Sequence, residues 1–398
     1  MQMPVSLRRA RGTSRLAGAH NIADLRRLAQ RRLPRVMFDH MDGAAEDEVT
    51  LARNADAFQR YDLVPRVLVD VSAVDLSTTL LGQAIDVPIV LAPTGTSRFF
   101  HHDGEVAVAR AAARAGTIYA LSAMGSTSIE EVAAASEGPQ WFQIYVWRDR
   151  ALVREFFRRC RDAGYEALCL TVDVPVLGRR ERDLRNGFTL PPQITAGTVW
   201  DAARHPSWTW HYLRTARPTL ANVAGRGAAS HDDVVSLGEY VNSQFDPAVM
   251  WADLEWMVEA WDGPFAIKGV LRREDAERAV SLGVGAVVVS NHGGRQLDQT
   301  PAALDALPAI VDVVGDRADV ILDGGIRRGT DIVKALALGA NAVMIGRPYL
   351  YGLGAAGEAG VEHALGILRD ETRRSMALAG ATSVAELDGR FVQPRRSD

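Results

Sequence analysis

The stretch 290–298, SNHGGRQLD, places a histidine and an arginine three residues apart around two glycines, directly after an apolar run. The imidazole of His292 can accept a proton near neutral pH if a carboxylate orients it, and Asp173 is a candidate for that carboxylate. Arg295 and Arg180 are suited to hold a carboxylate, and the hydroxyl of Tyr145 can stabilise charge on a substrate oxygen. This combination predicts proton abstraction beside a carboxylate, as when a 2-hydroxy acid is oxidised by a redox cofactor.

Lysine is rare in this chain, which makes its position informative. Only Lys268 and Lys334 are lysines among 45 basic residues, so almost every cation is an arginine. Lys268 lies inside the apolar run FAIKGV, where a buried ammonium group is costly unless it is paired. We therefore expect a functional role for Lys268, and none for Lys334 in its helical pattern DIVKALALGAN.

Short runs rich in β-branched residues alternate with amphipathic segments that end at glycine, and this alternation predicts the fold. It is typical of a (β/α)8 TIM barrel, with a doubly wound open sheet as the alternative. We expect one domain over 21–392, preceded by a disordered basic leader (1–20) and a helical extension, and followed by a short tail (393–398). Segment 178–264, after the fourth strand, is expected to be an insert or lid at the catalytic face. The eight predicted strands are 89–94, 118–123, 141–146, 167–173, 265–270, 286–291, 320–325 and 342–347.

Nearly all of these strands end on a polar or titratable residue, and in such barrels the catalytic groups lie at those ends. The last two strands run into the glycine-rich turns DGGIRRGTD and IGRPYLYG, where Arg327, Arg328 and Arg347 can neutralise a phosphate. No GxGxxG motif follows a first strand, and the pair His101–His102 stands alone, so neither a Rossmann dinucleotide site nor a metal site is expected. The ligand of the predicted phosphate site is therefore expected to be a phosphorylated substrate or a phosphorylated cofactor.

Composition excludes several other classes of function. A formal net charge of -4 gives no indication of a nucleic-acid partner. Two cysteines, expected to be buried and free, favour a reducing, cytoplasmic location, and no apolar run is long enough to span a membrane. The insert 195–230 combines Trp200, Trp208 and Trp210 with several arginines. It predicts either peripheral contact with the inner face of a membrane or a folded lid.

Several stretches resemble the FMN-dependent L-2-hydroxy acid dehydrogenase/oxidase family over residues 21–392. They include LTVDVPVLGRRERDLRNGF, SNHGGRQLD and LDGGIRRGTDIVKALALGA, and the insert is most similar to the lactate and mandelate dehydrogenase branch. The resemblance implies FMN as cofactor, His292 as base, Asp173 as its partner, Lys268 beside the flavin, and a homotetramer. It also implies that FMN is bound by Pro93, Thr94, Gly95, Ser122, Gln143, Thr171, Lys268, Ser290, Asp323, Gly325, Arg327, Gly346 and Arg347.

Three substrate-side positions depart from the family pattern or vary within it. His40 stands where the family has a tyrosine that touches the substrate carboxylate, and Met124 stands where glycolate oxidase has an aromatic residue. Gly95 matches dehydrogenases, which pass electrons to a quinone or another acceptor, where oxidases that use O2 often have alanine. Two alternatives stay open: an FMN-dependent tailoring oxidase with a non-standard substrate, and a flavin-free isomerase or lyase acting on a phosphorylated metabolite.

Overall fold

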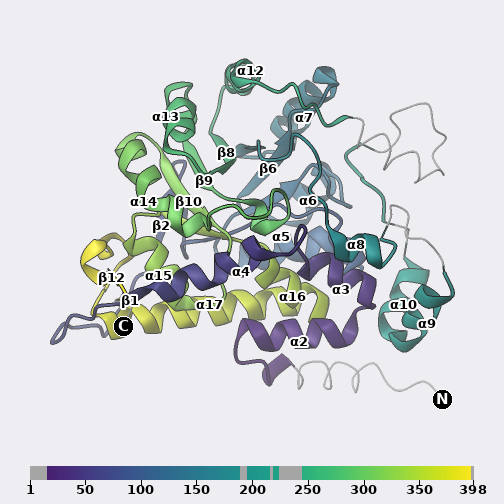
Figure 1. Cartoon of the computed structure of the whole chain (residues 1–398), viewed down its shortest axis with the longest axis horizontal. Coiled ribbons are helices and arrows are strands. Elements are labelled where there is room, and N and C mark those ends of the chain that lie inside the picture. Colours follow the sequence, from purple (N-terminus) through teal and green to yellow (C-terminus); the bar gives the residue numbers. More distant parts are fainter. Residues whose placement is uncertain (1–15, 189–194, 216–217, 224–243, 396–398) are drawn as a thin grey trace.

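The computed structural model describes residues 16–188, 195–215, 218–223 and 244–395, and its centre is a closed barrel of eight parallel strands (Figure 1). Neighbouring strands follow the order β10-β11-β4-β5-β6-β7-β8-β9 around the ring. The predicted TIM barrel is therefore confirmed, and the open-sheet alternative is wrong. The strands are β4 Ile89–Leu91, β5 Tyr119–Ser122, β6 Gln140–Tyr145, β7 Ala167–Thr171, β8 Phe265–Val270, β9 Ala286–Val289, β10 Asp319–Asp323 and β11 Ala342–Ile345.

Two apolar cores hold the barrel together. The inner core fills the ring with side chains that alternate along the strands, among them Val90, Trp141 and Met344. The outer core lies between the strands and the helices; α7 (Arg150–Asp162), for example, buries Phe156 and Phe157 on one face. The other helices after strands are α5 Gly104–Arg114, α6 Ile129–Ala135, α13 Arg273–Ser281, α14 Ala303–Val314, α15 Gly329–Ala337, α16 Arg347–Ala356 and α17 Glu358–Ala379. Both cysteines are buried and free, as expected.

The N-terminal extension packs along one side of the barrel as α2 (Ile22–Arg32), α3 (Arg35–Asp42) and α4 (Val49–Asp56) (Figure 1). Ala19, in the predicted leader, is already buried, and its carbonyl oxygen lies 2.7 Å from Nε2 of His363. The hairpin β2 (Thr78–Leu80) and β3 (Gln83–Ile85) contributes Leu80 and Ile85 to the inner core, so it closes the end of the barrel opposite the catalytic face.

A second small sheet ties the two ends of the fold together. Strand β1 (Tyr61–Leu63) pairs antiparallel with β12 (Val392–Pro394) near the C-terminus. The short turns around it are η1 Ala57–Arg60, η5 Val384–Glu386 and η6 Gly389–Phe391. These three-residue strands lie outside the predicted barrel pattern.

The insert after β7 contains α8 (Glu181–Arg185), α9 (Ala196–Arg204), α10 (Pro206–Arg214) and α12 (Trp251–Trp261). Helices α9 and α10 lie at one edge of the molecule beside α3 and α8 (Figure 1). Trp208 anchors α10, because its indole N–H donates to the carbonyl of Phe99 at 2.8 Å. The remaining parts of the predicted lid, 189–194, 216–217 and 224–243, lie outside the described residues. Among the described helices, none is long and apolar enough to cross a membrane.

Candidate active site

The SNHGGRQLD turn is held against α4 rather than standing free. The side-chain amides of Asn291 and Asn54 bond reciprocally at 2.8 and 2.9 Å, and Asp298 accepts from the backbone N–H of Thr50 at 2.7 Å. A Cβ on Gly294 would lie 2.8 Å from the backbone nitrogen of Leu51. Glycine is therefore required at position 294 for the close approach of α4.

His292 is placed at the mouth of the barrel in a left-handed conformation, with φ 57°. Its backbone N–H donates to Oγ of Ser290 at 3.0 Å, and its Nδ1 lies 3.0 Å from Oδ1 of Asp173. A non-glycine residue at positive φ is strained, and such strain is typical of functional sites. The pairing with Asp173, predicted from two distant stretches, leaves Nε2 of His292 as the nitrogen available to a substrate.

The charge states of Asp173 and Tyr145 suit proton transfer. Burial opposes ionisation of Asp173, but His292 and Lys268 outweigh it, so the pKa of Asp173 lies below its usual value. Burial and the nearby Asp173 raise the pKa of Tyr145 to about 12. Asp173 is thus a carboxylate that orients the imidazole, and Tyr145 keeps its hydroxyl proton and can donate a hydrogen bond.

Arg295 and Arg180 stand on the same side of the site. NH1 of Arg295 donates to the carbonyls of His40 and Gly43 at 2.8 and 2.9 Å, which fixes its position. Burial, together with Arg180 and Arg347, lowers the pKa of Arg295 well below its usual value. In the described part of the chain, the buried Nε of Arg180 has no hydrogen-bond partner. The two guanidinium groups therefore form a cationic site that an anion would stabilise.

Lys268 is buried in β8 and paired. Its Nζ lies 2.6 Å from Oδ2 of Asp323 and donates to Oγ of Ser290 at 2.9 Å. Burial works against the charge, yet Asp323 and Asp173 raise the pKa of Lys268 above its usual value, so the ammonium group persists. The expectation that this lysine needs a partner is confirmed. Lys334, by contrast, donates to the carbonyl of Phe58 at 2.8 Å, away from the site.

These residues surround one cavity of about 820 Å³. Four of the predicted site residues do not line the cavity, but each is hydrogen-bonded to a lining residue or pairs with one on the next strand. They are Asp173, Gln143, Thr171 and Ser290. The others line it directly: His40, Pro93, Thr94, Gly95, Ser122, Met124, Tyr145, Arg180, Lys268, His292, Arg295, Asp323, Gly325, Arg327, Gly346 and Arg347.

The polar groups at the barrel mouth fit a flavin. Gln143 accepts from Oγ of Ser122 at 2.9 Å, while its buried Nε2 has no partner among the described residues. A buried amide N–H without a partner is costly, and a carbonyl or ring nitrogen of a planar cofactor would satisfy it. The ammonium group of Lys268 on β8 offers a charge for an electron-rich part of such a ring.

Two of the three arginines that were predicted to bind a phosphate, Arg327 and Arg347, line the cavity. Arg347 also bonds to the backbone carbonyls of Asp42, Gly43 and Gly293 at 3.1, 2.8 and 3.0 Å. Arg347 therefore holds α3 against the barrel in addition to lining the cavity. Arg328 turns away from the cavity and pairs with Glu371 of α17.

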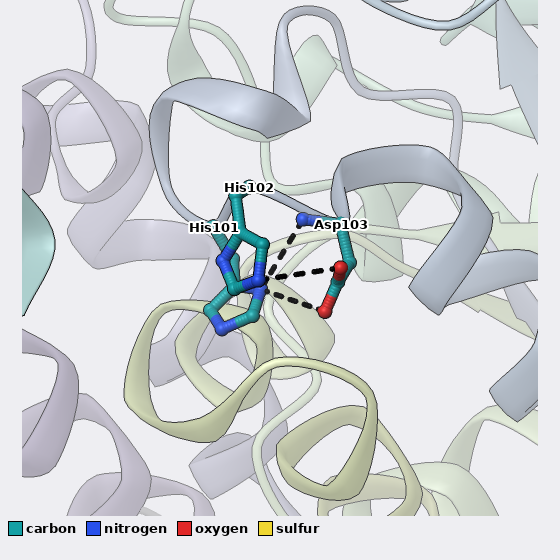
Figure 2. A group of neighbouring side chains, drawn as sticks. All are labelled: His101, His102 and Asp103. Carbon is teal, nitrogen blue, oxygen red and sulfur yellow. Dashed lines mark hydrogen bonds and ion pairs between the residues drawn. The ribbon is translucent and has the colours of Figure 1, made fainter. Parts of the chain in front are cut away.

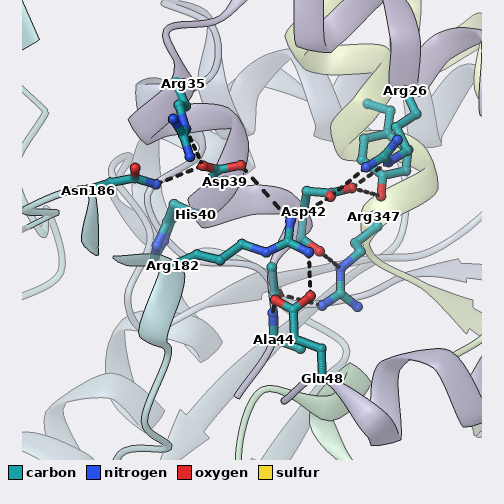
Figure 3. A network of polar contacts seen from close by, with 12 residues as sticks. Arg26, Arg35, Asp39, His40, Asp42, Ala44, Glu48, Arg182, Asn186 and Arg347 are labelled. Atoms are coloured by element: carbon teal, nitrogen blue, oxygen red, sulfur yellow. Dashed lines mark hydrogen bonds and ion pairs between the residues drawn. The ribbon is translucent and has the colours of Figure 1, made fainter. Parts of the chain in front are cut away.

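A network of charged residues lies beside Arg347 at this end of the site (Figure 3). Asp42 of α3 accepts from Nε of Arg26 at 2.6 Å and from NH1 of Arg182 of α8 at 3.1 Å. Arg182 also pairs with Glu48. Burial opposes the charge of Asp42, but its hydrogen bonds to Arg26 and Tyr351 bring its pKa to about 2. The extension is thereby fixed to both the barrel and the insert.

His40 has a partner that the sequence did not reveal. Its Nδ1 lies 2.9 Å from Oδ2 of Asp183 in α8, and its ring stacks on Phe188 at 3.9 Å between centroids. Five apolar residues line the same cavity as His40, and we call them the apolar wall: Phe100, Met124, Phe188, Leu220 and Phe245. Only Met124 among them was identified from the sequence.

In the structure, His101 and His102 have two further partners, Asp103 and the ring of His211. Nδ1 of His101 and Nε2 of His102 lie 3.3 and 3.4 Å from the carboxylate of Asp103, as Figure 2 shows. The ring of His211 in α10 stacks flat on His102, with centroids 4.3 Å apart. We call His101, His102 and His211 the histidine stack. It lies outside the cavity and joins α10 to the start of α5.

Comparison with known proteins agrees with this geometry. The sequence profile of the family described as FMN-dependent dehydrogenase matches residues 29–394. The chain is 44% identical to a putative L-lactate dehydrogenase of Mycobacterium tuberculosis over 383 residues, which cover 96% of this chain and 91% of that protein. It is 45% identical to L-lactate oxidase of Nostoc sp. over 376 residues, covering 94% and 97%.

Among solved structures, the crystal structure of the monotopic membrane protein (S)-mandelate dehydrogenase superposes with a TM-score of 0.90 at 38% identity, covering 95% of this chain and all 100% of that one. These relatives do not favour the alternatives of a tailoring oxidase or a flavin-free isomerase. The chain belongs to the FMN-dependent dehydrogenase family, and it is an FMN-dependent enzyme that oxidises the CH–OH group of a 2-hydroxy acid.

Proposed function

We propose that this enzyme converts an L-2-hydroxy acid with a bulky apolar side chain into the 2-oxo acid. The observation that carries the proposal is the meeting, in one cavity, of the His292–Asp173 pair with Arg180 and Arg295. One substrate carbon bears both the hydrogen to be lost and the carboxylate to be held. A base and two guanidinium groups around the same space match that carbon.

In the proposed reaction, Arg180 and Arg295 hold the substrate carboxylate, and the Tyr145 hydroxyl donates to the oxygen of the substrate hydroxyl group. The substrate loses two electrons and two protons, and Nε2 of His292 accepts one of those protons. Asp173 stabilises the imidazolium that forms. FMN, when bound, would accept the two electrons together with the second proton. Holding the carboxylate and orienting the base are the contributions of this chain.

The FMN site is proposed to use the residues that surround the barrel mouth and the phosphate turns. Gln143 offers its unpaired amide N–H, and Lys268 offers its ammonium group. Arg327 and Arg347 would neutralise the phosphate. The remaining contacts are proposed for Pro93, Thr94, Gly95, Ser122, Thr171, Ser290, Asp323, Gly325 and Gly346.

The apolar wall supports the choice of substrate. Phe188 and Phe245 face the cavity from the insert, and Met124 adds a flexible thioether. A relative and a structural neighbour are named for lactate and for mandelate, which differ in the size of the side chain. The wall of this chain favours an aromatic or long aliphatic side chain over a methyl group.

The test is anaerobic bleaching of the flavin absorbance across L-2-hydroxy acids with methyl, long-chain and phenyl side chains. We expect the phenyl and long-chain acids to bleach the flavin fastest at equal concentration. Failure of every acid to bleach a flavin-loaded protein would overturn the proposal. Faster bleaching by lactate than by mandelate would overturn the size preference alone.

We further propose that electrons leave to a quinone rather than to O2, because Gly95 matches the dehydrogenases of the family. Admission of oxygen to the bleached enzyme tests this: slow reoxidation by O2 and fast reoxidation by a soluble quinone are expected. A homotetramer built from the single domain 21–392 is likewise proposed, and light scattering of the purified protein measures it.

The α9–α10 pair is proposed as a peripheral membrane contact at the cytoplasmic face. Trp200 and Trp210 are 69% and 51% exposed, and Arg214 stacks on the ring of Trp210 at 3.8 Å. Trp208 is directed inward to Phe99, so it does not belong to the predicted contact. Arg217 and Arg226 lie outside the described residues. Sedimentation with anionic vesicles should fall in a Trp200→Ala/Trp210→Ala variant, and unchanged sedimentation would contradict the contact.

A further inference from the structure

His40 lies inside the proposed carboxylate site. Its side chain is 13% exposed, and it lines the same cavity as Arg180, Arg295 and His292. Figure 3 shows His40 near Arg182 and Asn186, and its Nδ1 lies 2.9 Å from Oδ2 of Asp183 in α8. The ring is also fixed by stacking on Phe188. Its orientation is therefore determined on two sides before any ligand arrives.

The bond to Asp183 determines which nitrogen carries the hydrogen. Burial opposes the charge on Asp183, but the hydrogen bond from His40 and the nearby arginines lower its pKa below the usual value. An ionised carboxylate can only accept, so Nδ1 of His40 must donate. In a neutral imidazole the second nitrogen, Nε2, then has a lone pair and no hydrogen. Nε2 has no hydrogen-bond partner among the described residues.

His40 is neutral while the site holds no anion. Burial is the largest cause, and Arg295 and Arg180 add to it, so the pKa of His40 falls to about 4 despite Asp183. These three are the charged groups that face the ring from other elements. On its own helix, Asp39 is engaged by Asn186 at 2.7 Å and by Arg35. Asp42, the other acid on α3, is bonded by Arg26 and by Arg182.

A substrate carboxylate changes this balance. Its oxygens can only accept, so an unprotonated Nε2 beside them is repulsive, whereas a protonated Nε2 donates a charge-assisted hydrogen bond. The imidazolium would then stand between two anions, Asp183 and the ligand. We infer that binding of a substrate carboxylate is coupled to uptake of one proton by His40, which completes the carboxylate site with Arg180 and Arg295. The inference rests on the proposed function, because it assumes that this cavity binds a carboxylate.

Proton uptake has a defined consequence for affinity. Between the pKa of His40 in the free enzyme, about 4, and its higher value in the complex, the Kd for a carboxylate should rise about tenfold per pH unit. A ligand with an amide in place of the carboxylate can donate its N–H to the neutral Nε2. Its affinity should therefore not depend on this proton. The same site would favour carboxylates at low pH and amides at high pH.

The test is calorimetry of the FMN-loaded enzyme with phenylacetate, which has an aromatic side chain and a carboxylate but no oxidisable hydroxyl group. Titration at pH 7 in buffers of different ionisation enthalpy gives the number of protons taken up. We expect about one proton for phenylacetate and none for phenylacetamide. The His40→Phe variant keeps an aromatic ring to stack on Phe188 and should bind phenylacetate without proton uptake.

His292→Gln is the matched control for the other imidazole in the cavity, and it should retain the uptake. If His40→Phe loses its FMN, His40→Tyr replaces it, since a phenol donates without taking up a proton. Equal proton uptake by wild type and the His40 variants, or no uptake by wild type, would overturn the inference. Flavin bleaching by L-mandelate without proton uptake on phenylacetate would leave the proposed function standing. The absence of both bleaching and phenylacetate binding would overturn that function as well.

Discussion

His292 has a strained backbone, a side chain paired with Asp173, and a second ring nitrogen that is free to meet a substrate. Its φ of 57° is stabilised by the bond to Ser290 and by the adjacent amide pair of Asn291 and Asn54. Asp173, which follows β7, fixes the tautomer. The surrounding contacts therefore hold the imidazole in place at a cost in backbone energy of about 1–3 kcal/mol.

Replacing the base should remove catalysis and spare the cofactor. We expect His292→Gln to slow anaerobic flavin bleaching by roughly 10²–10⁴-fold, the usual contribution of a general base. Stopped-flow absorbance measures the rate, and the unchanged flavin spectrum of the purified variant is the control. Bleaching within threefold of the wild-type rate, on the order of 0.6 kcal/mol in activation free energy, would show that another group removes the proton.

Gly95 has little space on its Met124 side. A Cβ there would lie 3.0 Å from Cβ and 3.1 Å from the carbonyl oxygen of Met124. Gly95→Ala should therefore displace Met124, raise KM for a phenyl substrate and lower the free energy of unfolding by about 1–2 kcal/mol.

Steady-state kinetics and thermal unfolding of Gly95→Ala check this prediction. Gly366→Ala is the matched control, because among the described residues no atom from outside the local backbone of its own helix lies within 4 Å of the added Cβ. A Met124→Gly change in the Gly95→Ala background should recover part of the loss. An unchanged KM in Gly95→Ala would mean that Met124 does not border the bound substrate.

At the residue scale, sequence reasoning found the groups whose chemistry is unusual for their position. Lys268 was identified because an ammonium group in an apolar strand needs a reason, and Asp323 supplies it. Asp183 and Phe188 were missed as partners of His40. Acids and aromatic residues are common on helices and loops, and only the fold brings α3 to the insert.

At the scale of elements, the eight barrel strands were predictable because buried parallel strands read as continuous β-branched runs. The attachment of α10 was not predictable. It depends on Trp208 and on the histidine stack, whose members come from the start of α5 and from the insert. Contacts between a barrel loop and an insert leave no periodic signal in the sequence.

The histidine stack should make the docking of α10 sensitive to acid. Burial is the main cause that lowers the pKa of His101 and of His102, with Arg32 adding to it in both cases. Arg98 and Asp103 are the other charged groups that face the stack. Since the folded-state pKa lies below the unfolded value, stability is full above the usual imidazole value of about 6.5 and falls as the pH drops below it.

Hydrogen exchange of the amides in 206–214 measures this effect. Protection, corrected for intrinsic rates, should be lower at about pH 5.5 than at about pH 7.5, on either side of the usual imidazole pKa. His102→Phe keeps a flat ring between its neighbours and removes one titrating group, so its protection should depend less on pH. Equal protection of the wild type at both values would contradict the prediction.

On the scale of the whole molecule, the extension, the barrel and the C-terminal segment form one unit. Helix α2 packs on α16, Arg347 bonds to α3, and β1 pairs with β12. The barrel could be anticipated, whereas the β1–β12 pairing could not, because three-residue strands are too short to show alternation.

Deleting residues 392–398 should lower the thermal midpoint and leave the site chemistry intact. The deletion removes β12 and the bond from the backbone N–H of Arg395 to the carbonyl of Arg60. We expect a loss of about 1–3 kcal/mol in the free energy of unfolding, with an unchanged rate of flavin bleaching. Calorimetry and stopped-flow absorbance measure the two. Loss of bleaching at full stability would instead connect this segment to the site.

The β1–β12 pairing also imposes an order of events on synthesis. Tyr61 pairs with Pro394, so β1 has to wait for a partner strand that is synthesised after all eight strands of the barrel. Contacts this distant in sequence form late, after the local βα units have folded. A nascent chain can therefore close its barrel before this sheet forms, and the pairing of β1 with β12 is a step that follows barrel closure.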